Sequence, residues 1–264
     1  MLNNQGICPN FHSIASSSKG NSYFVVFNGI RLLVDIGIGI RALENSLKSI
    51  GESLSAIDGI FITHEHTDHI KGLNSVYKKY KIPIYATKKT WEHLLAAGLI
   101  ANVDDDSKRI INPNETIDFF GLKIKAFSIP HDATDPVGYS ICYNDEKVVV
   151  CTDCGTVTND MLENAIGADI ILLEANHDAN MLDYGSYPFV LKRRISSNLG
   201  HLSNVQAGLF LKDIITKKTK QIFLGHLSQS NNNPLVAYET VKHILLNNNI
   251  GVNEDGCPSL SIIY

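Results

Sequence analysis

The chain has 264 residues and a mass of 29.1 kDa, with 44% hydrophobic residues and a formal net charge of −4. This composition is ordinary for a globular protein, and no apolar run is long enough to span a bilayer. A pI near 6.2 excludes an overall basic field for nucleic acid, although local basic patches remain.

The amino-terminal stretch and the cysteines indicate the compartment. Met1 to Pro9 lacks the charged-then-apolar order of a signal peptide, and the five cysteines have no regular spacing. We therefore expect a cytoplasmic protein without structural disulfides. Because there is no internal repeat, low-complexity tract or linker, we also expect one domain over residues 1–264.

Apolar runs and turn signals predict a mixed α/β fold. The expected strands are Tyr23–Phe27, Ile30–Ile36, Ile57–Ile62, Ile84–Thr87, Thr116–Phe119, Leu122–Phe127, Gly138–Tyr143, Lys147–Thr152, Asp169–Glu174 and Gln221–Leu224. The expected helices are Arg41–Ile50, Ile70–Tyr80, Thr90–Ala97, Thr158–Ile166, Ser203–Thr216 and Pro234–Leu246. Two β-rich halves, each with helices, predict two stacked sheets covered on both outer faces.

A cluster of metal-binding side chains follows the expected strand Ile57–Ile62. His64 and His66 are two residues apart, so they point the same way from an extended segment, while Asp68 and His69 follow where the chain turns into a helix. The spacing gives two pairs of ligands and suggests two metals. Structural zinc sites more often use spaced cysteine pairs, whereas histidines and carboxylates leave room for water. A solvated polar turn would seldom hold so many ligands.

These residues resemble a known signature. His64-x-His66-x-Asp68-His69, followed by Gly72-Leu73, is similar to the first motif of the metallo-β-lactamase-fold hydrolases. That family's later motifs are matched in order by Pro130-His131-Asp132, Thr152-Asp153 and Gly225-His226. The resemblance implies a four-layer αββα sandwich with two divalent ions at the strand ends. It implies His64, His66, His131 and Asp153 at one metal, and Asp68, His69, His226 and Asp153 at the other.

The later motif residues have ordinary explanations as well. A lone His131 after a proline would usually be a surface residue. Asp153 ends an apolar run, where a buried carboxylate is costly unless a cation neutralises it. It is flanked by Cys151 and Cys154, but a single C-x-x-C is a weak redox or zinc signal, so we expect Cys151 to be a packing residue and assign no chemistry to Cys154.

The metal cluster alone predicts hydrolysis and does not choose a substrate. Two metals lower the pKa of a bridging water to give hydroxide at neutral pH. Gly200-His201-Leu202-Ser203 resembles a segment of the tRNA 3′-end-processing endonucleases of this fold, and the Leu173–His177 stretch resembles the strand that supports it. This resemblance implies that His201 protonates the leaving oxygen and that Glu174 holds it; Asp68 is counted as catalytic and as a ligand. Otherwise His201, just before an N-cap serine, would be an exposed residue.

The chain resembles one branch of the family over nearly the whole length of that branch's proteins. The segments Gly225–Pro234, Leu173–Asp178 and Gly200–Asn204 resemble the YycJ/WalJ-type nucleases. This implies a metal-dependent 5′→3′ exonuclease on DNA, related to repair and with repair proteins as partners. The branch also has a serine-glycine loop like Ser16–Ser22. The candidate phosphate contacts are Ser17, Ser18 and Asn21 in this loop and the basic run Lys192, Arg193 and Arg194, which could instead be a loop and a solvated helix face.

Other hydrolases of this fold remain as alternatives. The Asp153–His226 interval is too short for the inserted domain of the β-CASP enzymes. A tRNA 3′-end-type endonuclease acting on RNA and a glyoxalase II-like thioester hydrolase stay open. Histidine and carboxylate ligands suit zinc, manganese or iron.

Overall fold

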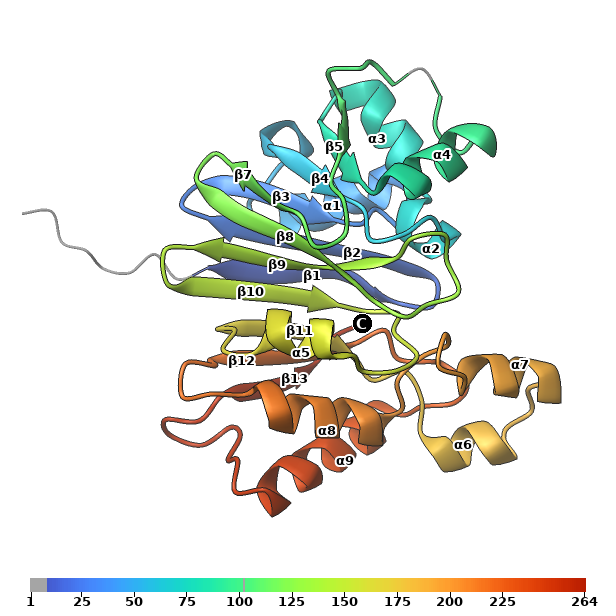
Figure 1. Cartoon of the computed structure of the whole chain (residues 1–264), viewed down its shortest axis with the longest axis vertical. Coiled ribbons are helices and arrows are strands. Elements are labelled where there is room, and N and C mark those ends of the chain that lie inside the picture. The colour runs from blue at the N-terminus through green and yellow to red at the C-terminus, as the bar shows by residue number, and fades with distance from the viewer. Residues whose placement is uncertain (1–8, 102) are drawn as a thin grey trace, which may run out of the picture.

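The strands of the protein form two sheets, seen in a computed structural model that describes residues 9–101 and 103–264 (Figure 1). The stretch Met1 to Cys8, which carries most of the expectation about a signal peptide, lies outside the described residues. None of the helices in the described part of the chain combines the length and apolar character of a membrane span.

The first sheet has six strands in the order β1-β2-β3-β4-β5-β6. β1, β2 and β3 pair antiparallel, and β3 to β6 pair in parallel. Asn28 and Gly29 join β2 to β3 with positive φ angles of 49° and 81°, as a tight hairpin turn requires. The strands are β1 (Asn10–Ser17), β2 (Gly20–Phe27), β3 (Ile30–Val34), β4 (Gly59–Phe61), β5 (Ile84–Ala86) and β6 (Lys108–Ile110).

The second sheet has seven strands in the order β13-β12-β11-β10-β9-β8-β7. Its β7 to β10 half is antiparallel, and β10 to β13 are parallel. Both sheets therefore contain parallel strands whose carboxyl ends can gather side chains at one edge. The strands are β7 (Thr116–Phe119), β8 (Leu122–Ser128), β9 (Val137–Tyr143), β10 (Glu146–Cys151), β11 (Ile170–Glu174), β12 (Gln221–Gly225) and β13 (Ser259–Ile262).

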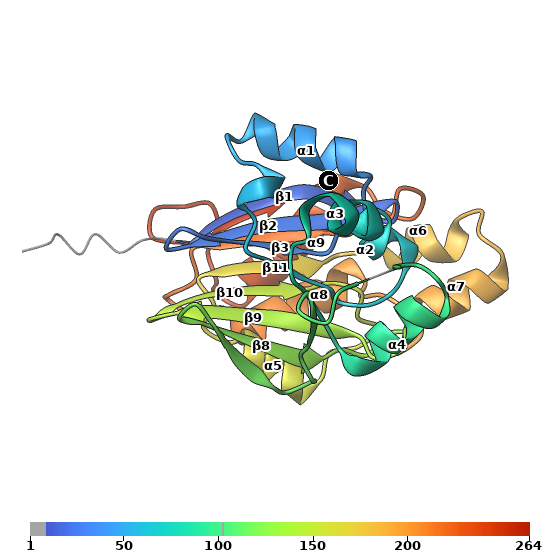
Figure 2. The same ribbon diagram turned by 90° about the horizontal axis from the view of Figure 1, so that it is seen from above.

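Helices cover both outer faces of the sandwich, and Figure 2 shows the strands between α1 on one side and α5 on the other. Helix α8 begins with a capping box between Ser203 and Gln206, and α9 begins with Asn233 as N-cap and a proline in its first turn. The helices are α1 (Ile40–Ser49), α2 (Thr67–Ile70), α3 (Leu73–Tyr80), α4 (Lys88–Ala96), α5 (Asn159–Ala165), α6 (Ala179–Tyr184), α7 (Phe189–Ile195), α8 (Asn204–Ile214) and α9 (Pro234–Asn247).

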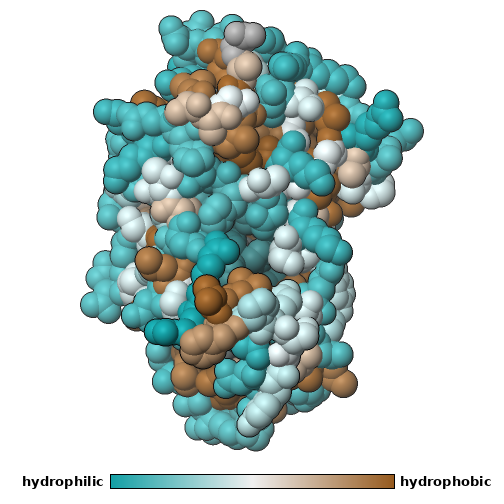
Figure 3. Space-filling view, turned by 90° about the vertical axis from the view of Figure 1, so that its right-hand side faces the viewer, coloured by the Kyte–Doolittle hydropathy of each residue, from teal (hydrophilic) through white to brown (hydrophobic). Residues whose placement is uncertain are grey.

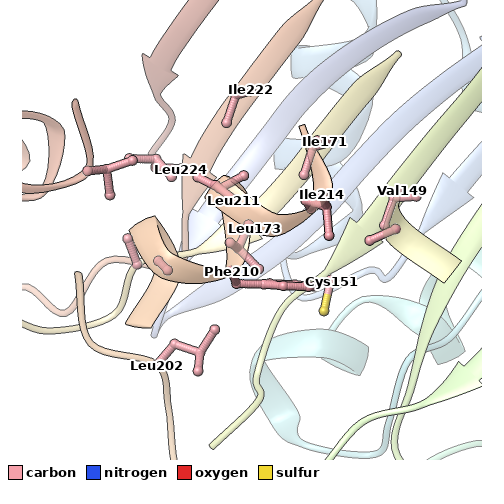
Figure 4. Close-up of a cluster of buried hydrophobic side chains, with 14 of the residues drawn as sticks. Val149, Cys151, Ile171, Leu173, Leu202, Phe210, Leu211, Ile214, Ile222 and Leu224 are labelled. Carbon is pink, nitrogen blue, oxygen red and sulfur yellow. The ribbon is translucent and has the colours of Figure 1, made fainter. Parts of the chain in front are cut away.

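Three buried hydrophobic clusters hold the layers together. One lies between the two sheets and a second lies between the first sheet and helices α1, α3 and α4. The third packs Phe210, Leu211 and Ile214 of α8 against β10, β11 and β12 (Figure 4). Cys151 belongs to this third cluster, as expected from the sequence. The four-layer αββα prediction is confirmed.

Several elements differ from the sequence predictions. The Ser16–Ser22 segment is not a loop but the tight β1–β2 hairpin, because Ser16 and Ser17 pair with Asn21 and Gly20. The helix expected over Ile70–Tyr80 is divided into α2 and α3 at Gly72, where a side chain would meet the carbonyl oxygen of Ile38 at 2.1 Å. The elements not predicted are β1, β6, β13, α6, α7 and the short 3₁₀ helix Leu54–Ala56.

Candidate metal centre

The candidate site lies where the parallel strands end. The chain leaves β4 into Thr63 and His64, β10 into Asp153 and β12 into His226, while Glu174 is the last residue of β11. Carboxyl ends of parallel strands meet at one edge, and the pocket found there has a volume of about 240 Å³. The residues lining it are Ser18, His66, Asp68, His131, Asp132, Asp153, Asn176, Tyr187, Leu191, Arg194, Ile195, Gly200, His201, His226 and Ser228.

Three histidines converge in the first cluster. The Nδ1 atom of His66 lies 3.1 Å from Nε2 of His64 and 3.3 Å from Nε2 of His131. Nitrogens bound to one tetrahedral ion at about 2.0–2.1 Å would lie about 3.3 Å apart. The spacing of these three nitrogens therefore fits a common divalent cation.

The second cluster pairs a carboxylate with two histidines. Oδ2 of Asp68 lies 3.5 Å from Nε2 of His69 and 3.7 Å from Nε2 of His226. His69 and His226, like His64 and His131 of the first cluster, are fully or almost fully buried, whereas His66 is partly exposed and the Asp68 side chain is 26% exposed. Asp68 thus faces the pocket from the edge of the cluster.

Asp153 lies between the two clusters. Its Oδ2 is 3.2 Å from Nε2 of His69, and its Oδ1 is 3.3 Å from Nε2 of His226 and 4.0 Å from Nε2 of His131. Burial acts to raise the pKa of this carboxyl, but the neighbouring histidines outweigh it and hold the pKa well below its usual range. One ionised carboxylate is therefore within reach of both groups of histidines.

The donor set fits divalent cations on two further observations. Within the described residues, Oδ2 of Asp153 and Nε2 of His226 are buried without a hydrogen-bond partner, a costly arrangement unless a cation lies between them. Burial also lowers the pKa of His64 well below its usual value, so its imidazole is neutral, the form that binds metals.

A second layer of residues fixes the histidine rings. Oδ2 of Asp35 accepts a hydrogen bond from Nδ1 of His69 at 2.7 Å and another from the Thr63 hydroxyl at 2.7 Å. The same hydroxyl lies 3.0 Å from Nδ1 of His64. Nδ1 of His131 donates to the carbonyl oxygen of Gly200 at 3.1 Å. In each case Nε2 is left free for a ligand role, as second-layer hydrogen bonds do in metal sites.

The backbone is unusual at three of these residues. Asp35, Asp153 and His226 have φ angles of 60°, 58° and 53°, in the left-handed region that non-glycine residues seldom adopt. Each follows the end of a strand, and the turn directs its side chain into the cluster. Such strained residues concentrate at functional sites because the surrounding structure must hold them.

A carboxylate and a histidine form a dyad beside the clusters. Oε2 of Glu174 is 3.1 Å from Nδ1 of His201 and 3.4 Å from Nδ1 of His226, and its Oε1 accepts the backbone N–H groups of Cys154 at 2.6 Å and Leu202 at 3.0 Å. Burial acts to raise the pKa of Glu174, but the charge of His201 and its hydrogen bond lower it to about 2. Glu174 is therefore ionised and fully buried, while the His201 side chain, which lines the pocket, is 20% exposed.

Comparison with known families identifies this architecture. Residues 30–226 match the beta-lactamase superfamily domain, a span that includes every proposed ligand. The chain belongs to the metallo-β-lactamase superfamily. The structure of the metallo-β-lactamase fold protein YhfI from Bacillus subtilis superimposes with a TM-score of 0.73, covering 97% of this chain and 96% of YhfI at 15% identity.

Two curated relatives place the chain more finely within the superfamily. It is 38% identical to exodeoxyribonuclease YycJ of Bacillus anthracis, with 92% of each chain covered. It is 37% identical to exodeoxyribonuclease WalJ of Streptococcus pneumoniae, covering 92% of this chain and 90% of WalJ. The resemblance to the YycJ/WalJ family is confirmed, and the protein is an enzyme of the metallo-β-lactamase hydrolase class.

In this metallo-β-lactamase-fold enzyme only some of the expected phosphate contacts line the pocket. Ser18 and Arg194 line the pocket, and Arg194 is paired with Asp132. Ser17 instead borders a neighbouring cavity. Asn21 differs most from expectation, because it is fully buried and its amide nitrogen lies 3.2 Å from Asp68 Oδ2 and 3.0 Å from His69 Nε2. It contacts the proposed ligands rather than solvent.

The other two basic residues point elsewhere. Nζ of Lys192 donates to the carbonyl oxygen of Asp183 at 2.7 Å, and the Arg193 guanidinium lies over the Phe189 ring. Both are outside the residues that line the pocket. Of the basic run, only Arg194 is brought to the site.

Sequence reasoning missed several residues of the site. Asp35 and Thr63 hold the histidines, and Asn176, whose amide donates to the backbone oxygen of His226 at 3.0 Å, lines the pocket. Asp35 carried a detectable signal, since it is an acidic residue directly after the apolar strand Ile30–Val34, the same pattern that singled out Asp153. Tyr187 and Leu191 had no recognisable sequence signal, because they come from the α6–α7 region, which was not predicted.

Proposed function

We propose that the protein is a two-metal phosphodiesterase that removes nucleotides from the 5′ end of DNA. The observation that carries this proposal is the Glu174–His201 dyad, whose His201 lines the same pocket as residues of both ligand clusters while Glu174 is buried behind it. A thioester hydrolase gives this dyad no role, because a thiolate departs without a proton. The names of the two relatives, both exodeoxyribonucleases, favour DNA.

The proposed ligands divide between the two ions. His64, His66 and His131 hold one ion, Asp68, His69 and His226 hold the other, and Asp153 reaches both. Zinc and manganese both suit these nitrogen and oxygen donors, and iron does as well. When bound, such ions polarise the phosphate and supply an activated water for attack on phosphorus.

The remaining residues bind and transfer protons. Attack on phosphorus breaks the bond to the leaving sugar oxygen, which departs as an alcohol if it receives a proton. His201 is assigned to donate that proton from Nε2, since Nδ1 is directed at Glu174. Asp68, ionised and at the pocket edge, is assigned to accept a proton from the attacking water. Ser18 and Arg194 are assigned to phosphate oxygens.

The test is hydrolysis of oligodeoxynucleotides labelled at the 5′ or the 3′ end, with manganese or zinc added. We expect release of labelled mononucleotide from the 5′-labelled strand first, and no hydrolysis by Asp153→Ala. Release from the 3′ end first would overturn the polarity. Hydrolysis of RNA but not DNA, or of a glutathione thioester alone, would replace the proposal with one of the two alternatives.

A further inference from the structure

A hydrophobic surface without an assigned role lies on α6 and α7, which Figures 1 and 2 show projecting from one end of the sandwich. Tyr184 is 89% exposed, Val190 79% and Phe189 71%. The first two are the most exposed large hydrophobic residues in the described part of the chain. On the face in Figure 3, hydrophobic residues are exposed in the lower half, where these helices lie, as well as in the upper half. A contiguous group of exposed hydrophobic side chains often marks a binding surface.

This surface continues into the active-site pocket. Leu191, Arg194 and Ile195 of α7 line the pocket, and Phe189 is at the amino end of the same helix. Seven residues at 1.5 Å each make α7 about 10 Å long, roughly the length of three stacked nucleotides at 3.4 Å each. A strand whose end is in the pocket would therefore pass over Phe189 within a few nucleotides.

The surface is also basic, in contrast to the whole protein. Between residues 179 and 199 there are three basic residues, Lys192, Arg193 and Arg194, and one acidic residue, Asp183, whereas the chain as a whole has a net charge of −4. The Arg193 guanidinium lies 5.7 Å from the centre of the Phe189 ring. An arginine over an exposed aromatic ring is a combination that attracts both a base and a phosphate.

We propose that Tyr184, Phe189 and Arg193 form a stacking platform that binds the unpaired bases of single-stranded DNA next to the cleavage site. Exposed aromatic rings bind base faces, which are accessible in a single strand and hidden in a duplex. The platform deepens the proposed function and rests on it for the direction of the strand. The platform therefore requires that the DNA next to the cleavage site be single-stranded, either from the start or through fraying of a duplex end.

The experiment measures binding of a fluorescein-labelled oligothymidylate with phosphorothioate linkages, which resist cleavage, to the metal-loaded enzyme. Stacking on one aromatic side chain is worth roughly 5-fold to 150-fold in affinity, so Phe189→Ala and Tyr184→Ala should each weaken binding within that range. Phe189→Trp should retain affinity, and its fluorescence should be quenched on binding. Hydrolysis of bis(p-nitrophenyl) phosphate, which has no bases to stack, should be unchanged in all three variants.

Phe120→Ala is the matched control. Phe120 is 74% exposed at the β7–β8 turn, at the opposite end of β8 from His131, so its loss should not change oligonucleotide affinity. Equal weakening by Phe120→Ala, equal weakening on a blunt duplex, or unchanged affinity in the platform variants would overturn the proposal. So would a change from dimer to monomer in sedimentation with unchanged affinity, which would assign this surface to a second copy of the chain.

The outcomes separate the two proposals. Platform variants that lose affinity in a protein that binds DNA without hydrolysing it would leave the platform standing and remove the exonuclease. Platform variants that hydrolyse DNA normally and bind the oligonucleotide with unchanged affinity would remove the platform and leave the exonuclease standing.

Discussion

Replacing His201 by alanine tests the proposed proton transfer on two substrates. The leaving oxygen of DNA is a sugar alkoxide, which needs a proton, whereas bis(p-nitrophenyl) phosphate expels a stable phenolate that does not. General acid catalysis typically contributes 10²–10⁴-fold, which corresponds to about 2.7–5.5 kcal/mol of the activation barrier. We therefore expect His201→Ala to lower kcat on DNA by roughly that factor and to keep much of the activity on the activated ester.

The structure indicates that this loss should be local. Without His201, Glu174 still accepts the backbone N–H groups of Cys154 and Leu202 and lies 3.4 Å from Nδ1 of His226, so no buried carboxylate is left without partners. Metal content and melting temperature should therefore stay close to the wild type. The assay is steady-state hydrolysis of both substrates, with His66→Ala as the variant expected to lose both. Equal losses on the two substrates by His201→Ala, with metal intact, would refute the acid role.

Two further substitutions test the supporting structure. Asp35→Asn should weaken metal binding roughly 10- to 100-fold in a chelator competition titration, because the ring of His69 loses its charged acceptor; unchanged affinity would remove Asp35 from the site. Asp169→Asn should lower the free energy of unfolding at pH 7 by about 1–3 kcal/mol, because this buried carboxylate accepts the backbone N–H of Lys147 and pairs with Lys218. Burial acts to raise the pKa of Asp169, but these contacts outweigh it and hold the pKa below its usual value. A depressed pKa contributes stability above the unfolded value near 3.9 that is lost as pH falls through the folded value, so urea unfolding should show the variant and the wild type converging below about pH 4. A difference that stays constant down to pH 2 would contradict this sign, taking pH 2 as roughly the lower limit of the window.

The parts of the fold that could be predicted are those where burial requires a recognisable pattern of apolar residues in the sequence. In strands β10 and β11, residues Val148–Cys151 and Ile170–Leu173 are buried and form continuous apolar runs. Strand β1 was missed because its residues are largely polar and half-buried, and its pairing with β2 is what makes it a strand. Helices α6 and α7 were missed because they are short and few of their apolar residues are buried: Leu182 is the one buried residue of α6, and α7 has none.

The candidate site shows the same division. Motif residues that are close in sequence, such as His64 and His66, and strand-end residues such as Asp153 could be found because their types and positions are informative alone. The grouping of Asp35 with His69 depends on the parallel β3–β4 pairing, which no single stretch of sequence contains. Asn21 was expected in a phosphate-binding loop from its serine and glycine neighbours, but the hairpin buries it beside the ligands.

The central claim is that the clusters around Asp153 form a two-metal centre that drives hydrolysis. Elemental analysis of the purified enzyme, combined with a titration of DNA hydrolysis against added metal after chelation, tests it most directly. The account predicts two ions per chain and activity that is complete only when both are bound, with Asp153→Ala folded but empty of both. Full activity with one ion or none per chain would contradict it.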